Sequence, residues 1–579
     1  MLNERSFWVT GGVVVALLAL AVPLTRADYV DGEVLPMTQP DGTLLQVRIW
    51  GDEFYTVVET LDGYTLIRDP LTGYICYAGL SEDGNALYST GVAVGTGDPA
   101  GLGLARHVRI NPEAAAAQAR VVREHFRRYG GPGPWSGETD GLDGPTVGDV
   151  KGICLIVDFV DDVGTIPPAE VTAYCNQPGY TGFGNNGSIY DYFHDVSDEL
   201  LRYTNYVPAA YYRALHPKTY YNDPNISYGL RARELIIEAL THLDGQGFNF
   251  AEYDADHDGY VDALNCLYAG NSNSAWAQGL WPHAWTVDFC ADGVCTRRYQ
   301  ITDMRAALRI STFCHENGHM LMGWPDLYDY DGDSRGVGRF CIMCSSTSAT
   351  NPQHPCAYNK ATAQWSTVHA LTVPQIGLEA PVDVNVAYKF PHPTRPNEYY
   401  LIENRQRIGR DVGLPDAGLA IWQIDTQGSN NYQERLPNRH YKVTLVQADG
   451  RWDLENNRNS GDTTDLWKAP TYTQCTPFTN PNTNWWAGNS SDLYVLEIGE
   501  PGPVMTFTFR TPTPPRPGDL NCDGAVDFND INPFVLILQD PGAWQTAYPA
   551  CPPANGDVNG DGHVDLGDIN PFVALLAGP

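Results

Sequence analysis

The sequence is poor in positive charge and in long apolar segments. It has 36 Lys and Arg against 69 Asp and Glu, which gives a net charge of −33 over 579 residues. Because nucleic-acid binding depends on basic side chains that neutralise phosphates, this balance argues against a nucleic-acid partner. After residue 27, no segment is long and apolar enough to cross a membrane. The 43% hydrophobic content nevertheless indicates a globular chain, and the length predicts three or four domains.

The first 27 residues are typical of a secretory signal peptide. Arg5 precedes a largely apolar stretch at 7–20, and Thr25-Arg26-Ala27 has small residues at the two positions that matter for cleavage. An uncleaved N-terminal anchor is the alternative. We therefore expect a secreted, extracellular protein, whose excess of carboxylates suits calcium binding as well as solubility.

The 13 cysteines are an odd number, and export permits disulfides. Cys290 and Cys295 flank A-D-G-V and can close a hairpin, while Cys522 and Cys551 can link the C-terminal segment. Four further cysteines offer either a C-x-x-C bond or a longer-range pairing: Cys314, Cys341, Cys344 and Cys356.

Residues 28–129 predict a β-rich N-terminal segment that ends in a helix. Alternating apolar residues at 44–50 and 54–59, beside D-G turns, predict hairpins. The stretch 112–129 begins with proline and ends with arginines, as helices prefer. The Gly- and Pro-rich segment 130–149 predicts a linker. In a secreted protease this layout indicates a pro-segment on a cleavable tether, and a permanent accessory domain is the alternative.

The motif H-E-x-x-H occurs at His315, Glu316 and His319. Residues i and i+4 share one face of a helix, so both imidazoles can bind one metal ion. Glu316 lies beside the first ligand, where it can take a proton from a water molecule at the metal. We expect Ser311 or Thr312 to cap this helix. An amphipathic helix with two surface histidines is the alternative.

A catalytic zinc site uses three protein ligands and leaves one position open. Asp326 in W-P-D-L-Y-D, just after the predicted helix, is our candidate for the third ligand, and Asp329 or a more distant acid is the alternative. The acids at 329–333 also suit a turn or a calcium loop. Met343 follows in a turn of small residues.

This block resembles the active site of the immune inhibitor A family of zinc metallopeptidases, which shows H-E-x-x-H-x-x-G-x-P-D-x-Y-D and then a methionine turn, as metzincins do. Here Gly323 and Asp326 each come one residue later than in that pattern. The resemblance covers most of residues 28–510 and implies a metzincin-like zinc peptidase domain at 150–370. Its implied site residues are the zinc ligands His315, His319 and Asp326, the general base Glu316 and, beneath the metal, Met343.

A second metal motif, D-A-D-H-D-G-Y-V-D, occupies residues 254–262. Its oxygens alternate and its sixth residue is glycine, as in the first part of an EF-type calcium loop. Position twelve is Asn265, so the usual bidentate Glu is missing. The predicted calcium ligands are Asp254, Asp256, Asp258 and Asp262, and a simple D-G turn is the alternative.

The region after the predicted peptidase domain is rich in strand-forming residues. Residues 371–510 include apolar runs at 398–404, 418–425 and 504–509. We expect some of these strands to complete the catalytic domain and the rest to form a β-sandwich. The Pro-rich segment 511–517 predicts a stiff linker.

Residues 518–579 contain an internal repeat and no Lys, Arg or Glu. The pattern G-D-x-N-x-D-G-x-V-D-x-x-D-I-N-P-F-V occurs twice, with oxygens at loop positions 1, 3, 5, 9 and 12 and glycine at 6. Nine aspartates without a basic partner would repel one another unless a cation binds. The predicted calcium ligands are Asp519, Asn521, Asp523, Asp527, Asp530, Asp557, Asn559, Asp561, Asp565 and Asp568.

This repeat resembles a dockerin type I domain, which implies paired EF-type loop-helix units and a cohesin partner. The whole chain is therefore expected to be a multidomain α+β protein: a secreted zinc endopeptidase acting on proteins or peptides, with β-rich flanking domains and a calcium-binding dockerin. A dockerin-bearing glycan hydrolase is one alternative, but it leaves H-E-x-x-H unexplained. A catalytically inactive adhesive or scaffold protein is the other.

Overall fold

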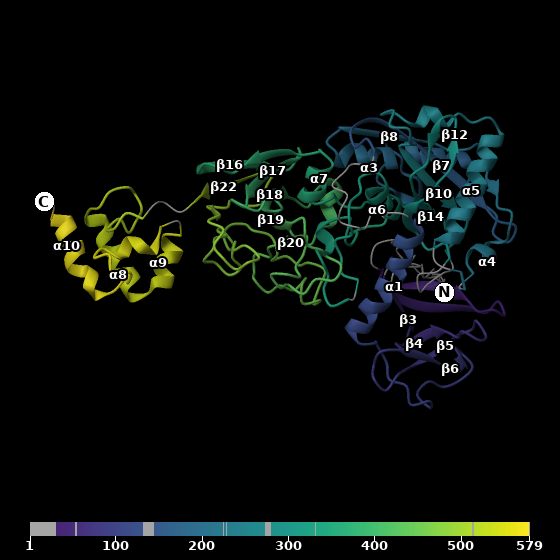
Figure 1. Ribbon diagram of the computed structural model, residues 1–579, viewed down its shortest axis with the longest axis horizontal. Coiled ribbons are helices and arrows are strands. Elements are labelled where there is room, and N and C mark those ends of the chain that lie inside the picture. The colour runs from purple at the N-terminus through teal and green to yellow at the C-terminus, as the bar shows by residue number, and fades with distance from the viewer. Residues whose placement is uncertain are drawn as a thin grey trace, which may run out of the picture.

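The computed structural model describes residues 30–51, 55–130, 144–223, 225–226, 229–272, 279–330, 332–511, 515–549 and 551–577. The predicted signal peptide lies outside these ranges, as do much of the predicted linker 130–149 and part of that at 511–517. The chain is a mixed α/β protein that runs from an N-terminal sheet to a C-terminal helical module at the opposite end (Figure 1). None of the described helices is both long and apolar enough to span a bilayer.

The N-terminal region is a six-stranded sheet whose strands follow one another in sequence order. Antiparallel neighbours joined by short turns are what the alternating sequence predicts. The predictions of a strand at 44–50 and of a helix at 112–129 are confirmed, as is that of a strand within 54–59, of which residue 54 lies outside the described residues. The elements are β1 (Val30–Thr38), β2 (Leu44–Gly51), β3 (Thr56–Thr60), β4 (Thr65–Arg68), β5 (Ile75–Leu80), β6 (Leu87–Ala93) and α1 (Pro112–Gly130).

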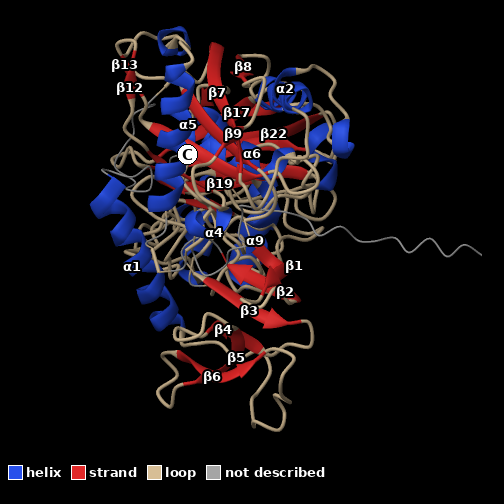
Figure 2. Ribbon diagram, turned by 90° about the vertical axis from the view of Figure 1, so that its right-hand side faces the viewer, coloured by secondary structure: helices blue, strands red, loops and turns tan. Residues whose placement is uncertain are grey.

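The central region has a second sheet, in the order β11-β14-β10-β7-β8, with β9 also paired to β7. Strands β14, β10, β7 and β8 are parallel neighbours, whereas β11 at the edge is antiparallel to β14. In Figure 2 this sheet lies above β4, β5 and β6 of the N-terminal region. Its strands are β7 (Gly148–Asp158), β8 (Leu201–Tyr206), β9 (Tyr212–Arg213), β10 (Ala263–Tyr268), β11 (His283–Thr286) and β14 (Arg298–Asp303).

Helices and a small hairpin complete the central region. Ser188 caps α3 (Ile189–Val196) through a reciprocal capping box with Asp191. The disulfide between Cys290 and Cys295 closes the hairpin of β12 (Cys290–Ala291) and β13 (Val294–Cys295), which confirms that pairing. The helices are α2 (Pro168–Asn176), α3 (Ile189–Val196), α4 (Lys218–Tyr221), α5 (Leu230–Gly245), α6 (Ile310–Met320) and α7 (Ala357–Thr362).

The β-rich region forms two sheets, β15-β17-β18-β19-β20 and β16-β22-β21. Strand β18 is buried along its whole length because both of its faces are covered. Leu401 lies in the core shared with the central region, whereas Tyr400 and Ile402 lie in the core shared with β22. The strands are β15 (Thr367–Ala370), β16 (Gln375–Pro381), β17 (Val386–Pro391), β18 (Glu398–Arg405), β19 (Gly418–Asp425), β20 (Val443–Leu445), β21 (Tyr494–Leu496) and β22 (Val504–Arg510).

The C-terminal module has its own small core. Phe534 and Phe572, at equivalent positions of the two repeats, stack with ring centroids 4.2 Å apart. The disulfide between Cys522 and Cys551 confirms the predicted link. The other proposed pairings are wrong, because the buried Cys314, Cys341, Cys344 and Cys356 form no disulfide in the described part of the chain. The helices are α8 (Ile531–Gln539), α9 (Pro541–Ala547) and α10 (Ile569–Ala577).

Candidate metal centre

Helix α6 carries the H-E-x-x-H motif and is buried along its entire length. It lies against β14 and β11, and Phe313 contributes to the largest core. The expectation of a cap at Ser311 or Thr312 is wrong, because both lie inside the helix. The amide of Ile310 instead donates to Asn185 Oδ1 (3.3 Å). The start of the helix is therefore held by a side chain 125 residues away.

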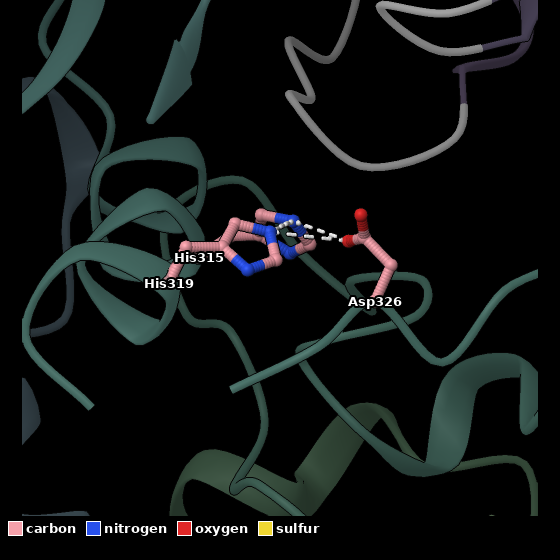
Figure 3. Close-up of side chains that lie close together, drawn as sticks. All are labelled: His315, His319 and Asp326. Atoms are coloured by element: carbon pink, nitrogen blue, oxygen red, sulfur yellow. Dashed lines mark hydrogen bonds and ion pairs between the residues drawn. The ribbon is translucent and has the colours of Figure 1, made fainter. Parts of the chain in front are cut away.

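Three side-chain atoms converge beside α6 (Figure 3). His315 Nε2 lies 3.1 Å from His319 Nε2, and each of these nitrogens lies 3.2 Å from Asp326 Oδ1. Ligands placed about 2.0–2.1 Å from a tetrahedral zinc ion are themselves about 3.3 Å apart. The spacing of the three atoms therefore fits one metal ion, and the displacement of Asp326 by one residue does not prevent it from joining the group.

The second nitrogen of each imidazole fixes the tautomer. His315 Nδ1 lies 2.9 Å from the carbonyl of Ile342, and His319 Nδ1 lies 2.6 Å from that of Trp324. Because a carbonyl only accepts, both Nδ1 atoms carry the hydrogen, and the neutral rings turn bare Nε2 lone pairs toward Asp326. Asp326 Oδ1 is buried, and no hydrogen bond to it is found among the described residues. Three electron-rich atoms thus face one another, an arrangement that a cation between them stabilises.

The loop after the helix orients Asp326. Its other oxygen, Oδ2, accepts a hydrogen bond from Tyr330 Oη (2.6 Å), which leaves Oδ1 directed at the imidazoles. Burial alone would raise the pKa of Asp326, but when His319 and His315 carry a proton on Nε2 in place of a metal ion, their charge and hydrogen bonds outweigh burial and hold that pKa below its usual value. Burial lowers the pKa of His319, which favours the neutral ring that metal binding needs.

Glu316 and Met343 are both buried. Glu316 is 3% exposed and follows His315 on α6. Met343 is fully buried, and the preceding residue, Ile342, supplies the carbonyl that orients His315. A Cβ added to Gly318 would come within 2.5 Å of Met343 Sδ, so the glycine inside the motif lets the methionine approach the helix.

The alternative third ligand, Asp329, takes part in a turn. Its Oδ2 accepts hydrogen bonds from the amides of Asp333 (3.0 Å) and Ser334 (3.2 Å). Asp329 does not join the group formed by the two histidines and Asp326. Asp331 lies outside the described residues. The geometry therefore favours Asp326 over Asp329.

The sequence did not predict a buried network of polar side chains that contacts α6. Asn317, inside the motif, donates to Asn265 Oδ1 (3.0 Å), as does Gln300 (3.0 Å). Asn265 Nδ2 in turn donates to Tyr203 Oη (2.7 Å) and Asn205 Oδ1 (2.8 Å). Asn265 therefore ties β10 to the motif helix, which explains why position twelve of the preceding loop holds no acid. Its only sequence signal is a polar residue within the apolar strand L-N-C-L-Y.

The loop at 254–262 brings Asp254, Asp256 and Asp262 together as a second group able to hold a metal ion. Asp254 Oδ2 accepts from the amide of Gly259 (3.1 Å), whose φ of +88° favours glycine. Asp262 Oδ2 is buried without a hydrogen-bond partner, and burial raises the pKa of this carboxyl to about 7. Asp258 is not in the group, and its Oδ2 lies 3.6 Å from Arg297.

The two C-terminal loops repeat this backbone pattern. Asp519 accepts from the amide of Gly524 (3.1 Å) and Asp557 from that of Gly562 (2.9 Å), and both glycines have φ near +89° and +88°. Asp519 Oδ1 is buried and unpartnered. Over the described part of the module, however, no three of the predicted carboxylates gather as closely as in the two groups above. Asp527 and Asp565 cap the short helices that follow their loops.

A third group, Asp449, Asp462 and Asp465, was missed by the sequence analysis. Asp465 is 1% exposed, and burial, reinforced by the neighbouring carboxylates, raises its pKa to about 8. Asp462 and Asp465 belong to the segment S-G-D-T-T-D and lie three residues apart. No spacing rule connects them to Asp449, which reaches them only in the folded chain.

Comparison of the chain with protein-family models and with curated proteins found no match to either. What the structure establishes is that histidine and carboxylate groups are placed where they could hold metal ions.

Proposed function

We propose that the protein is a secreted zinc-dependent endopeptidase that carries a calcium-binding, dockerin-like module. The observation that carries this proposal is the convergence of His315 Nε2, His319 Nε2 and Asp326 Oδ1 at 3.1–3.2 Å, with both imidazoles oriented by backbone carbonyls. Two nitrogens and one carboxylate oxygen are a ligand set that catalytic zinc sites use, with a fourth position left for substrate or water.

When bound, zinc would supply a Lewis acid that polarises the scissile carbonyl and acidifies a neighbouring water molecule. Glu316, buried next to His315, would take the proton from the attacking water and return it to the leaving amine. The O–H bond of water and the C–N bond of the substrate break, and a C–O and an N–H bond form. His315, His319 and Asp326 hold their ligand atoms in place and take no proton in this scheme.

The resemblance of the motif region to the immune inhibitor A family supports the same reaction, although Gly323 and Asp326 are displaced by one residue. An aspartate at the third position is consistent with that family's pattern. The N-terminal sheet with α1 would then be the pro-segment, followed by the predicted linker. The glycan-hydrolase alternative assigns no role to the oriented histidine pair, and the inactive-scaffold alternative is an outcome of the experiment below.

Two features support a calcium-dependent partner-binding role for the C-terminal module. The first aspartate and the glycine of each loop make the same hydrogen bond in both repeats. Each repeat also exposes equivalent apolar side chains, which suit a protein partner of the cohesin type. These are Phe528, Ile531 and Val535 in the first repeat and Leu566, Ile569 and Val573 in the second.

The test is to measure metal content and casein cleavage of the protein, before and after cutting the chain between residues 130 and 149. Wild type should contain one zinc ion per chain together with calcium, and should cleave casein. Glu316→Gln should retain the zinc but lose about 10²–10⁴-fold in kcat. Calcium without zinc, and no cleavage by the cut protein, would leave the inactive-scaffold alternative.

A further inference from the structure

The segment that carries Asp326 has no helix or strand between Leu321 and Tyr330. A metal ligand on irregular backbone keeps its position only if other groups hold that backbone. Tyr330 orients the carboxylate, but its own backbone belongs to the same loop. Groups outside the loop must therefore hold its backbone.

Two adjacent residues of the β19–β20 connection, Asn430 and Asn431, contact this loop. Asn431 Nδ2 donates to the carbonyl of Asp326 (3.3 Å) and to that of Tyr328 (2.9 Å). The backbone carbonyl of Asn431 accepts from the amide of Tyr330 (2.9 Å). Asn430 Nδ2 donates to the carbonyl of Leu327 (3.3 Å). The backbone of the loop is therefore held at four residues, Asp326, Leu327, Tyr328 and Tyr330.

The asparagines are themselves anchored. Asn430 Nδ2 also donates to the carbonyl of Val443 (2.8 Å) on β20, and its Oδ1 accepts from the amide of Val443 (2.9 Å). Asn430 is 1% exposed and Asn431 is 8% exposed, so little water competes for these bonds. Asn430 therefore links β20 of the β-rich region to the loop that carries Asp326, and Asn431 binds the same loop beside it.

We propose that Asn430 and Asn431 are positioning residues for the metal centre: they fix the Asp326 loop so that its carboxylate meets the two histidines. The inference rests on the proposed metal-binding function. Carbonyl oxygens only accept, so the residue facing them must donate two hydrogens, and an amide does so where an isosteric carboxylate cannot. The β-rich region is then part of the catalytic machinery's support and not a separable addition.

The experiment compares Asn431→Asp with Asn404→Asp in the full chain. Asn404, on β18, is a matched control: it is 5% exposed and its Nδ2 donates to two carbonyls, those of Ala380 (2.9 Å) and Gly502 (3.0 Å). Zinc affinity, measured by competition with a chelator, should fall about 10–100-fold in Asn431→Asp, as for loss of an outer-shell partner. It should stay within about threefold of wild type in Asn404→Asp, because distant sites act independently.

Two further readouts separate positioning from general destabilisation. The absorption spectrum of the Co²⁺-substituted protein should change in Asn431→Asp and not in Asn404→Asp. Excess zinc should restore cleavage by the former. If Asn431→Asp does not fold, Asn431→Ala, which removes the donors without adding charge, replaces it. Equal zinc affinities in the two asparagine variants would overturn the proposal. Zinc binding by wild type without casein cleavage would contradict the peptidase function alone.

Discussion

In the candidate metal centre, hydrogen bonds to the outer atoms of the three side chains decide which of their atoms face one another. His315 and His319 each give their Nδ1 hydrogen to a carbonyl, and Asp326 uses Oδ2 to accept from Tyr330. Each group has one remaining atom, and these three atoms meet. The choice between Asp326 and Asp329, open in the sequence, is thus a matter of which carboxylate is committed to a backbone turn and which is aimed at the rings.

A pair of matched substitutions tests this assignment. Asp326→Asn should abolish stoichiometric zinc binding, with a loss of affinity beyond the roughly 10–100-fold of an outer-shell change. Asp329→Asn keeps an oxygen that can accept from the amides of Asp333 and Ser334, so zinc content should be unchanged. Zinc content of each dialysed protein is the measurement. Loss of zinc in the Asp329 variant only would assign the third ligand to Asp329.

At the level of elements, α6 depends on close approach by the turn at Met343. Met343 contacts the helix where Gly318 lacks a side chain, and Ile342 orients His315 from the same turn. The backbone amide of Leu327, next to Asp326, also donates to the carbonyl of Met343 (2.7 Å). The helix, the turn and the ligand loop therefore form one unit.

Gly318→Ala is expected to disrupt this unit. The new methyl group would overlap Met343 Sδ in a fully buried site, which should cost about 1–3 kcal/mol of unfolding free energy. Gly245→Ala, at the end of α5, is the control: nothing lies within 4 Å of its added Cβ, and it should be neutral or stabilising by about 0.4–1 kcal/mol. Urea unfolding measures both. Equal midpoints would mean that Met343 repacks without cost.

At the scale of the whole molecule, one core extends across the predicted boundary at 370. Leu401 and Trp422 of the β-rich region share the large core with α6, while the opposite face of the same sheet forms the second core. The chain also has a large excess of acidic side chains, and the fold buries some of them close together. Asp465 is one of these, and burial raises its pKa to about 8.

Asp465 should make stability fall as pH rises. Its folded-state pKa lies above the unfolded value of about 3.9, so the stability it contributes is full below pH 4 and is lost by pH 8. With chelator present, the free energy of unfolding of Asp465→Asn should therefore exceed that of wild type by on the order of 1–3 kcal/mol at pH 8. This difference should shrink as the pH falls toward 4. Denaturant unfolding across this range is the measurement.

The control for this prediction is Asp288→Asn, because the side chain of Asp288 is 92% exposed. The free energy of unfolding of Asp288→Asn should equal that of wild type at every pH, because solvent screens an exposed carboxylate. A gap for Asp465→Asn that is constant with pH would show that the carboxyl does not titrate in this interval.

The local pattern of the sequence determined much about this protein, because short-range spacing dictates which side chains share a face. It placed His315, Glu316 and His319 on one helix, predicted the hairpins near 44–59 and the helix at 112–129, and marked the three aspartate–glycine loops. It also paired Cys290 with Cys295 and Cys522 with Cys551, which lie 5 and 29 residues apart in the sequence.

Only the tertiary structure decided what depends on distant partners. The cap of α6 comes from Asn185, the support of the Asp326 loop from Asn430 and Asn431, and the role of Asn265 from Asn317 and Gln300. None of these contacts follows the two-residue period of a strand or the 3.6-residue period of a helix, so no local sequence pattern predicts them. They arise because burying α6 along its whole length leaves polar groups that must find partners wherever the folded chain provides them.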